Sequence, residues 1–347
     1  MKHTYLIAEI GQNHNGSCDV AKLIIDLVSR APADEMFGHK LDRIDAVKMT
    51  KRDLDHELSD SQRNVPYDSV NSFGATYGEH REALELSDEQ HFEVYQYAKS
   101  LGLDFVETLC APSCLSMLEL FTPDYLKVAS RDLTNLPLLD AMAETKIPII
   151  ISTGMAGQKE LDDALDVISK HHSNIAILHC VSQYPTDPVN VNLRTMDWLR
   201  ENYPQYRIGY SDHTIGISIP VAAAAMGAEI IEKHVTIDRR MKGSDHSCSL
   251  GPDGVMRMAR DIRLLDYSLG EKKICIAEGV DVAKKKLQRS IASARPIKAG
   301  ETISEQDIHL LSPGDGFSWA DRKNVVGRVA TADIPANEII YNQMLAN

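Results

Sequence analysis

Gly209-Tyr-Ser-Asp-His-Thr214 and Ile231-Glu-Lys-His-Val235 are two short segments in which an apolar run ends at a histidine, His213 and His234. A run of small and apolar residues typical of a helix, 219–226, lies between them. Parallel strands that are joined by a helix carry their carboxyl ends to the same edge of a sheet. The spacing therefore predicts that the two imidazoles lie close together at that edge, where they can hold a metal ion facing a pocket.

Strand-like runs alternate with helical segments from the N-terminus to about residue 265. The eight runs are 5–10, 46–50, 104–109, 125–130, 148–153, 175–181, 207–211 and 229–235. This alternation predicts a parallel sheet, and eight such units favour a closed α/β barrel of the (β/α)8 (TIM) type. An open doubly wound sheet is the alternative, but no GxGxxG motif follows the first run.

The segment between the second and third strands, 51–86, is long, polar and rich in turn residues. A loop of this length at the carboxyl end of a barrel strand is more often functional than idle. Within it, residues 77–81 are predicted either to close over a substrate or to form a plain surface excursion.

The composition changes after Gly270. We predict a barrel domain over 1–270, a charged linker over 271–288 and a small, β-rich domain over 289–347. The last domain carries two similar segments, Ile297-Lys-Ala-Gly-Glu301 and Ile334-Pro-Ala-Asn-Glu338, which read as two copies of one turn. A module this short can bury only a small core of its own, so we expect it to pack against a second chain.

The bulk composition excludes several classes of protein. The net charge of −13 argues against sequence-independent binding of nucleic acid, which requires a basic surface. No apolar run is long enough to span a membrane, and the first ten residues lack a signal-peptide pattern, so a cytoplasmic location is expected. Six cysteines without a CxxC pair do not indicate a disulfide framework.

Reactive residues of such barrels gather where the strands end. The polar residues at these positions are Glu9, Lys48, Thr50, Thr108, Lys127, Ser130, Asp132, Ser152, Tyr184, Ser211, Glu232 and the two histidines. Two lysines with several hydroxyls can hold a phosphate or a carboxylate. The two histidines, with Glu9 nearby, can hold a divalent metal of the Mn, Co or Zn type whose other positions are filled by water or substrate. His179 lies within an apolar run and is predicted to be a core residue.

Longer motifs occur in order along the chain. They are Ala8-Glu-Ile-Gly-Gln-Asn-His-Asn-Gly16, Lys127-Val-Ala-Ser-Arg-Asp-Leu-Thr-Asn135, Ile151-Ser-Thr-Gly-Met155 and His179-Cys-Val-Ser-Gln-Tyr-Pro185, together with the two segments quoted first. These motifs resemble the sialic acid synthase family over the whole chain. The module after Arg289 resembles that family's C-terminal SAF domain, which is similar to type III antifreeze proteins.

The resemblance implies an enzyme, a transferase that joins phosphoenolpyruvate to the aldehyde of N-acetylmannosamine or a related hexosamine. The products are a nine-carbon 2-keto-3-deoxy sugar acid and phosphate. It also implies a divalent metal, manganese above all, with magnesium or cobalt as alternatives. The family forms a dimer in which each C-terminal domain caps the partner's barrel, so a domain-swapped homodimer is expected.

The resemblance also assigns roles to residues. It implies that His213 and His234 bind the metal, and that these two histidines act in catalysis together with Glu9 and Glu232. The phosphoenolpyruvate site is implied to consist of Lys48, Thr108, Lys127, Ser130, Ser152 and Ser211. The sugar site is implied to consist of Thr50, Asp132, Tyr184, Asp245 and Ser312.

Several positions depart from the family pattern, and most of them fall in the sugar site. Thr50 replaces a glutamine, Asp132 a glutamate that bacterial members often have, Ser182 an asparagine and Ser312 an arginine that precedes Pro-Gly in bacterial N-acetylneuraminate synthases. One hypothesis is therefore that the aldose is not mainly N-acetylmannosamine, and that the product is a legionaminic, pseudaminic or KDN-like acid. Two other hypotheses are a Schiff-base aldolase using Lys127 or Lys233, and a binding protein without activity.

Overall fold

The computed structural model describes residues 3–29, 35–36, 38–41 and 43–346 of the chain. Contacts divide it into two compact units, and the chain passes from the first to the second between Gly270 and Glu271. The outermost residues of the predicted domains, 1, 2 and 347, lie outside the described residues.

The first unit is built around eight parallel strands that close into a barrel in the order β1-β10-β9-β8-β7-β6-β5-β4. Their bounds are β1 Tyr5–Gly11, β4 Ala46–Lys51, β5 Asp104–Leu109, β6 Tyr125–Val128, β7 Ile149–Ser152, β8 Ile175–Cys180, β9 Arg207–Asp212 and β10 Ile230–His234. Each strand begins and ends within two residues of the run that predicted it. The predicted (β/α)8 barrel is confirmed.

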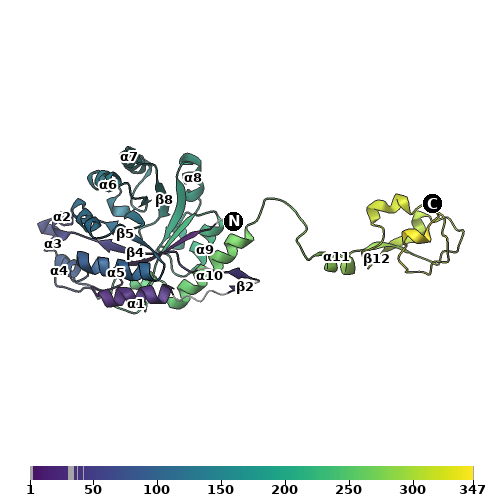
Figure 1. The fold of residues 1–347 in the computed structure, drawn as a ribbon, viewed down its shortest axis with the longest axis horizontal. Helices are drawn as coiled ribbons and strands as arrows, with labels where there is room; N and C mark the ends of the chain where they lie inside the picture. The colour runs from purple at the N-terminus through teal and green to yellow at the C-terminus, as the bar shows by residue number, and fades with distance from the viewer. Residues whose placement is uncertain (1–2, 30–34, 37, 42, 347) are drawn as a thin grey trace. The chain divides into compact units, whose positions relative to one another are not determined.

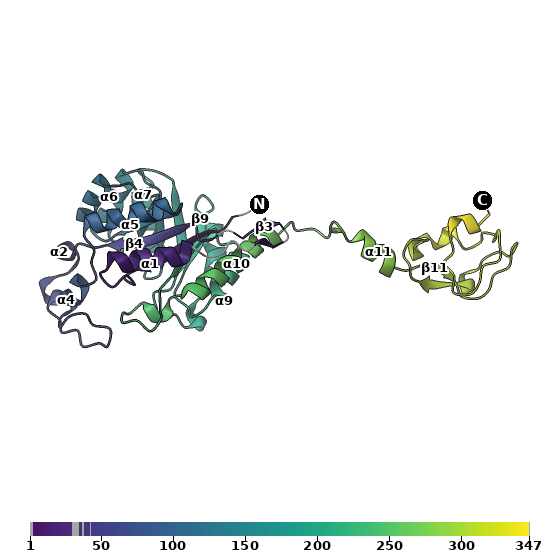
Figure 2. The same ribbon diagram turned by 60° about the horizontal axis from the view of Figure 1, so that its bottom comes forward.

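Helices surround the strands (Figures 1 and 2). They are α1 Cys18–Ser29, α5 Asp88–Ser100, η1 Pro112–Glu119, α6 Leu136–Glu144, α7 Gln158–Ile168, α8 Thr195–Asn202, α9 Ser218–Ala225 and α10 Pro252–Ser268. Their local starts follow from the sequence: Ser87 and Gln90, for example, form a capping box that begins α5. Within the described ranges, no helix is long and apolar enough to cross a membrane.

The alternation of side chains along each strand separates two environments. One set of strand residues packs outward with the helices in the large core. The opposite set packs inside the barrel, where Ile7, Val106 and Ile150 belong to a small apolar cluster. Because side chains two residues apart share a face, the next inward positions on these strands are Glu9, Thr108 and Ser152. The barrel interior is therefore apolar at its amino end and polar at its carboxyl end.

The segment 51–86 differs from the predicted loop, because it contains three short helices. These are α2 Leu54–Glu57, α3 Asp60–Arg63 and α4 Tyr77–Glu82. Thr76 and Glu79 form a capping box at the start of α4. The prediction of a loop did not take this local signal for a helix into account. Both views show α2 and α4 at one end of the barrel (Figures 1 and 2). A two-stranded hairpin, β2 Glu35–Met36 and β3 His39–Lys40, lies between β1 and β4 in the sequence.

The second unit contains α11 Asp281–Leu287, three short 3-10 helices and an antiparallel pair, β11 Ser290–Ser293 with β12 Ile308–Leu311. It has a small apolar core, which includes Ile291, Ile303 and Ile340. The two predicted turns pair with each other, since Ile297 and Ile334 exchange both backbone hydrogen bonds. Each turn has a positive φ at its fourth residue, Gly300 at 84° and Asn337 at 63°. Glycine and asparagine tolerate this conformation best, which explains why the two copies share a shape.

Candidate active site

A cavity of about 240 Å³ is formed by the last residues of the barrel strands and by the loops that follow them. It brings together nearly all of the residues that were predicted as a site from the sequence. These are Glu9, Lys48, Thr50, Thr108, Lys127, Ser130, Ser152, Tyr184, Ser211, His213, Glu232, His234 and Asp245. They come from all eight strands or the loops directly after them, so closure of the barrel is what unites them.

Two lysines and two glutamates form an ionic network at the base of the cavity. The Lys48 ammonium lies 2.6 Å from Glu9 Oε2 and 3.7 Å from Glu232 Oε1, and the Lys127 ammonium lies 3.9 Å from Glu232 Oε2. Lys48 donates to Thr108 at 3.1 Å, and Lys127 donates to Ser152 at 2.6 Å. All four charged groups are buried. Two ammonium groups beside hydroxyls form the kind of site that holds a small anion.

The two carboxyl groups have opposite acidities. Burial raises the pKa of Glu9 to about 7, although the Lys48 ammonium acts in the other direction. Burial would also raise the pKa of Glu232, but the ammonium groups of Lys127 and Lys48 outweigh it and lower that pKa to about 2. Glu232 is therefore a permanent counter-ion of the lysines, whereas Glu9 can gain or lose a proton near neutral pH.

The two predicted metal ligands lie side by side. The ring centroids of His213 and His234 are 5.3 Å apart, and the Tyr184 ring covers His213 at 4.1 Å. His213 Nδ1 lies 3.0 Å from the carbonyl oxygen of Val181, which can only accept a hydrogen bond, so Nδ1 carries a proton and Nε2 is the nitrogen that could bind a metal.

The donor set of the histidine pair fits a metal ion. His234 Nδ1 is buried without a hydrogen-bond partner, and burial lowers the pKa of His234 to about 3, so that this imidazole is neutral. Imidazole nitrogens are ligands that suit Mn, Co or Zn. No third protein ligand accompanies them at metal-binding spacing among the described residues. The remaining positions would therefore belong to water or substrate, as expected from the sequence.

Two predicted sugar-site residues do not line this cavity. Asp132 is mostly buried beside it, and its carboxylate accepts a hydrogen bond from Arg131 at 3.2 Å. Ser312 belongs to the second unit, where its hydroxyl lies 3.3 Å from the carbonyl oxygen of Leu287. The contact of Ser312 with a sugar stays a prediction.

Two further residues considered from the sequence face away from the cavity. Lys233 is fully buried on the outer face of β10 and donates to Asp212 at 2.5 Å, so it cannot reach a substrate in the cavity. His179 is also buried, with Nε2 2.7 Å from the carbonyl oxygen of Val191, which confirms it as a core residue. Of the two lysines considered for a Schiff base, Lys233 is therefore excluded, whereas Lys127 lines the cavity.

The cavity wall also contains side chains that the sequence analysis did not single out. They include Gln12, Arg52, Arg81, Arg131 and Ser244. All of them come from loops or short helices. There the alternation of inward and outward side chains along a strand cannot predict which residues face the cavity. One signal was present, because Arg81 lies in the segment 77–81 that was considered as a cover for the substrate.

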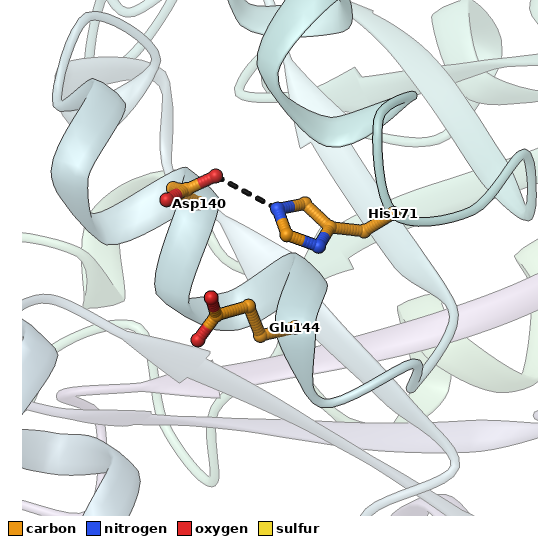
Figure 3. Close-up of side chains that lie close together, drawn as sticks. All are labelled: Asp140, Glu144 and His171. Carbon is orange, nitrogen blue, oxygen red and sulfur yellow. Dashed lines mark hydrogen bonds and ion pairs between the residues drawn. The ribbon is translucent and has the colours of Figure 1, made fainter.

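A second group of potential metal ligands lies on the protein surface. Asp140 and Glu144 project from α6 toward His171, whose Nε2 lies 2.8 Å from Asp140 Oδ1 (Figure 3). Both carboxylates are exposed, and none of the three residues lines the cavity. A surface ion pair accounts for this arrangement.

The fold is that of a barrel enzyme, whose cavity of lysines, hydroxyls and imidazoles lies at the carboxyl ends of its strands. The chain matches the NeuB family over residues 40–274 and the SAF domain over residues 288–346. It therefore belongs to the NeuB family.

Relatives match the chain over almost its full length. Human N-acetylneuraminate-9-phosphate synthase is 32% identical over 345 residues, which cover 99% of this chain and 93% of the human protein. N,N'-diacetyllegionaminic acid synthase of Legionella pneumophila is 33% identical over 338 residues, 96% of this chain and 92% of that protein. The crystal structure of N-acetylneuraminic acid synthetase from Leptospira borgpetersenii has a TM-score of 0.68 at 28% identity, covering 81% of this chain and 90% of that one.

These similarities confirm the predicted relationship to the sialic acid synthases. They also confirm that the chain is an enzyme, a phosphoenolpyruvate-condensing synthase of the transferase type. The small C-terminal unit, with its two-stranded sheet, is the predicted SAF domain.

Proposed function

We propose that the protein joins phosphoenolpyruvate to the open-chain aldehyde of N-acetylmannosamine or a related hexosamine derivative. The products are a nine-carbon 2-keto-3-deoxy sugar acid and phosphate. One observation carries the proposal: two buried lysines, four hydroxyls and two neighbouring imidazoles line a single cavity at the carboxyl ends of the strands.

Lys48 and Lys127 bind the phosphate and carboxylate of phosphoenolpyruvate in this scheme. Thr108, Ser130, Ser152 and Ser211 complete the anion site with their hydroxyls. The enol carbon attacks the aldehyde carbon and forms the new carbon–carbon bond, and the aldehyde oxygen becomes a hydroxyl by taking up a proton. The lysines stabilise the negative charge that collects on the departing phosphate.

Glu9 is the proposed general base. Water adds to C2 of the former phosphoenolpyruvate and loses a proton to the Glu9 carboxylate. The bond between C2 and the phosphate oxygen then breaks while the proton of the new C2 hydroxyl passes to the departing phosphate, which releases phosphate and leaves the 2-keto group. Glu232 keeps its negative charge and holds the two ammonium groups in position.

His213 and His234 would hold a divalent metal, which we propose to be manganese. Bound there, the metal would supply polarisation of the aldehyde oxygen. The neutral state of His234 and its unpartnered Nδ1 support this assignment.

The test is metal-dependent release of phosphate from phosphoenolpyruvate in the presence of an aldose. The panel contains N-acetylmannosamine, mannose and diacetamido-trideoxyhexoses, each with Mn²⁺ and with EDTA. We expect one aldose to support release that EDTA abolishes. If no aldose supported release although phosphoenolpyruvate and Mn²⁺ were bound, the proposed reaction would be wrong.

Which aldose the protein uses is a more specific question than which reaction it catalyses. The relatives make different sugar acids at nearly equal identity, so they do not distinguish among aldoses, and they do not favour an aldose other than N-acetylmannosamine. A swapped homodimer and a cytoplasmic location stay predictions.

The dependence of activity on pH follows from the acidity of Glu9. A base must be ionised to act, and burial raises the pKa of Glu9 to about 7. We therefore expect kcat/KM to fall about tenfold per pH unit below about pH 7 and to level off above it.

Replacement of Glu9 provides the matching variant. Glu9→Gln should lower kcat by ~100- to 10,000-fold and remove the acidic limb of the profile. Glu201→Gln, an exposed site at the end of α8, is the matched control and should leave both unchanged. An acidic limb that persisted in Glu9→Gln would assign the base to another group.

A further inference from the structure

A buried ion pair on the outer face of the barrel has no role in the reaction described above. Lys233 of β10 and Asp212 of β9 are partners in the register of these strands, and the Lys233 ammonium donates to Asp212 Oδ2 at 2.5 Å. The exposed fraction of each side chain is 0%. The preceding outward positions on the two strands, Tyr210 and Ile231, belong to the large apolar core. The two charges therefore lie beside apolar side chains and away from water.

Burial makes this ion pair a costly way to stabilise the barrel. Removing an ammonium group and a carboxylate from water carries a desolvation cost that their mutual attraction does not always exceed. Two apolar side chains of similar volume often stabilise a protein as well or better at such a position. The effect that sets the pair apart from apolar packing is therefore the geometry that its hydrogen bonds impose on the residues around it.

These hydrogen bonds hold both chain neighbours of His213. Asp212 Oδ1 accepts from the backbone N–H of Thr214 at 3.1 Å, and Asp212 Oδ2 accepts from the Thr214 hydroxyl at 3.1 Å. The Lys233 ammonium donates a second hydrogen bond to the carbonyl oxygen of Thr214. The Tyr210 hydroxyl donates to Asp212 Oδ1 at 2.9 Å. The backbone is thus fixed on both sides of the His213 imidazole.

The same lysine lies between two residues of the cavity. Glu232, Lys233 and His234 are consecutive on β10. Because side chains alternate along a strand, Glu232 and His234 line the cavity while Lys233 faces outward. Asp212 likewise faces outward directly before His213, which lines the cavity. A shift of Lys233 relative to Asp212 would therefore move the two imidazoles relative to each other.

We propose that Asp212 and Lys233 are positioning residues, whose ion pair sets the separation and orientation of His213 and His234 for the metal. The ring centroids of the two histidines are 5.3 Å apart. Because these two imidazoles supply the protein nitrogens of the site, a small change in their separation alters the affinity for the metal. The inference rests on the proposed function, since that proposal assigns the metal to this histidine pair.

The test is the affinity of the full-length protein for Mn²⁺, measured without substrates by electron paramagnetic resonance of the free ion. Asp212→Asn and Lys233→Met are combined in one variant, which removes both charges and leaves no buried charge without a partner. We expect its Kd for Mn²⁺ to rise ~10- to 100-fold, the effect typical of losing the groups that orient metal ligands. At saturating Mn²⁺ the KM for phosphoenolpyruvate should change little, because Lys48 and Lys127 keep their contacts.

Asp266→Asn is the matched control. Asp266 of α10 is also buried, and it accepts hydrogen bonds from the Thr4 N–H at 3.0 Å, the Thr4 hydroxyl at 2.7 Å and Arg263 at 3.3 Å. It therefore reproduces the contacts of Asp212 with a threonine and a cation, but it lies beside the amino end of β1 and does not line the cavity. This variant should unfold at a lower temperature and keep the wild-type affinity for Mn²⁺. An equal loss of affinity in Asp266→Asn would attribute the effect to general stability and overturn the inference.

A milder variant covers the case in which the double replacement does not fold. Thr214→Val removes the hydroxyl that donates to Asp212 and leaves the ion pair in place. It should raise the Kd for Mn²⁺ ~3- to 10-fold, the effect of one lost hydrogen bond. An unchanged Kd in this variant, or in the folded double variant, would contradict the positioning role.

Failure of the inference can be distinguished from failure of the proposed function. If the Kd for Mn²⁺ is unchanged in the variants while phosphate release stays metal-dependent, the inference is wrong and the proposed function stands. If the wild type binds no Mn²⁺, the proposed metal is wrong, and crystal structures of the wild type and the variant decide the inference. A changed separation of the His213 and His234 rings would then support positioning, and an unchanged separation would overturn it.

Discussion

Replacing Lys127 by methionine is expected to lower the rate of phosphate release by ~100- to 1000-fold. The Lys127 ammonium donates to Ser152 and lies 3.9 Å from Glu232, deep in the cavity. Methionine keeps the length of the unbranched stem but removes the charge. The departing phosphate then loses a cationic partner, and Glu232 keeps only Lys48 as a neighbouring ammonium group.

The measurement is steady-state phosphate release with saturating aldose and Mn²⁺. Lys159→Met is the matched control, because Lys159 makes the same type of ion pair, with Asp163, on the exposed side of α7, and its side chain is 80% exposed. It should retain wild-type activity. Thermal unfolding of both variants separates a loss of charge in the site from a loss of fold. Activity of Lys127→Met within threefold of wild type would exclude Lys127 from the anion site.

Replacing His213 or His234 by alanine is expected to lower metal-dependent activity by ~1000-fold, because each removes one of two protein nitrogens available to the metal. The two rings lie 5.3 Å apart, and His234 Nδ1 has no other partner. Bound Mn²⁺, measured by electron paramagnetic resonance after gel filtration, should fall from about one per chain in the wild type to near zero in either variant.

The control for this experiment is His171→Ala. His171 belongs to the surface group with Asp140 and Glu144, which also offers three potential ligand atoms (Figure 3). This variant should keep both its activity and its bound Mn²⁺. Loss of Mn²⁺ from His171→Ala with retention in His213→Ala would move the metal to the surface group.

The barrel was predictable because its signal is local and repeated. Each strand coincides with an apolar run in the sequence, and each run is separated from the next by a helical segment. Gly209–Thr214 and Ile231–Val235 are the clearest pair, since they place a histidine at the same depth on consecutive strands. The lysines and hydroxyls of the site could be predicted for a related reason, because the strand ends of a closed barrel all face one cavity.

The arginines were not predictable by this reasoning. Arg52, Arg81 and Arg131 lie on a loop and two short helices, whose positions depend on packing and on the shared contact with Glu57. Asp132 stands near a strand end in the sequence, and its carboxylate accepts a hydrogen bond from Arg131 beside the cavity, so its contact with a sugar stays a prediction. Sequence adjacency does not tell which way a residue outside a regular strand points.

The sequence by itself determined the barrel, the SAF domain, the family and the chemical character of the residues at the strand ends, because these depend on short-range periodicity and on motifs. Only the tertiary structure decided which of those residues share a cavity, that Lys233 faces away from it and that three arginines face into it. It also decided the acidities of Glu9 and Glu232, which have the same side chain but opposite shifts of pKa. Burial and the distances to two ammonium groups set those shifts, and both quantities exist only once the strands have closed into a barrel.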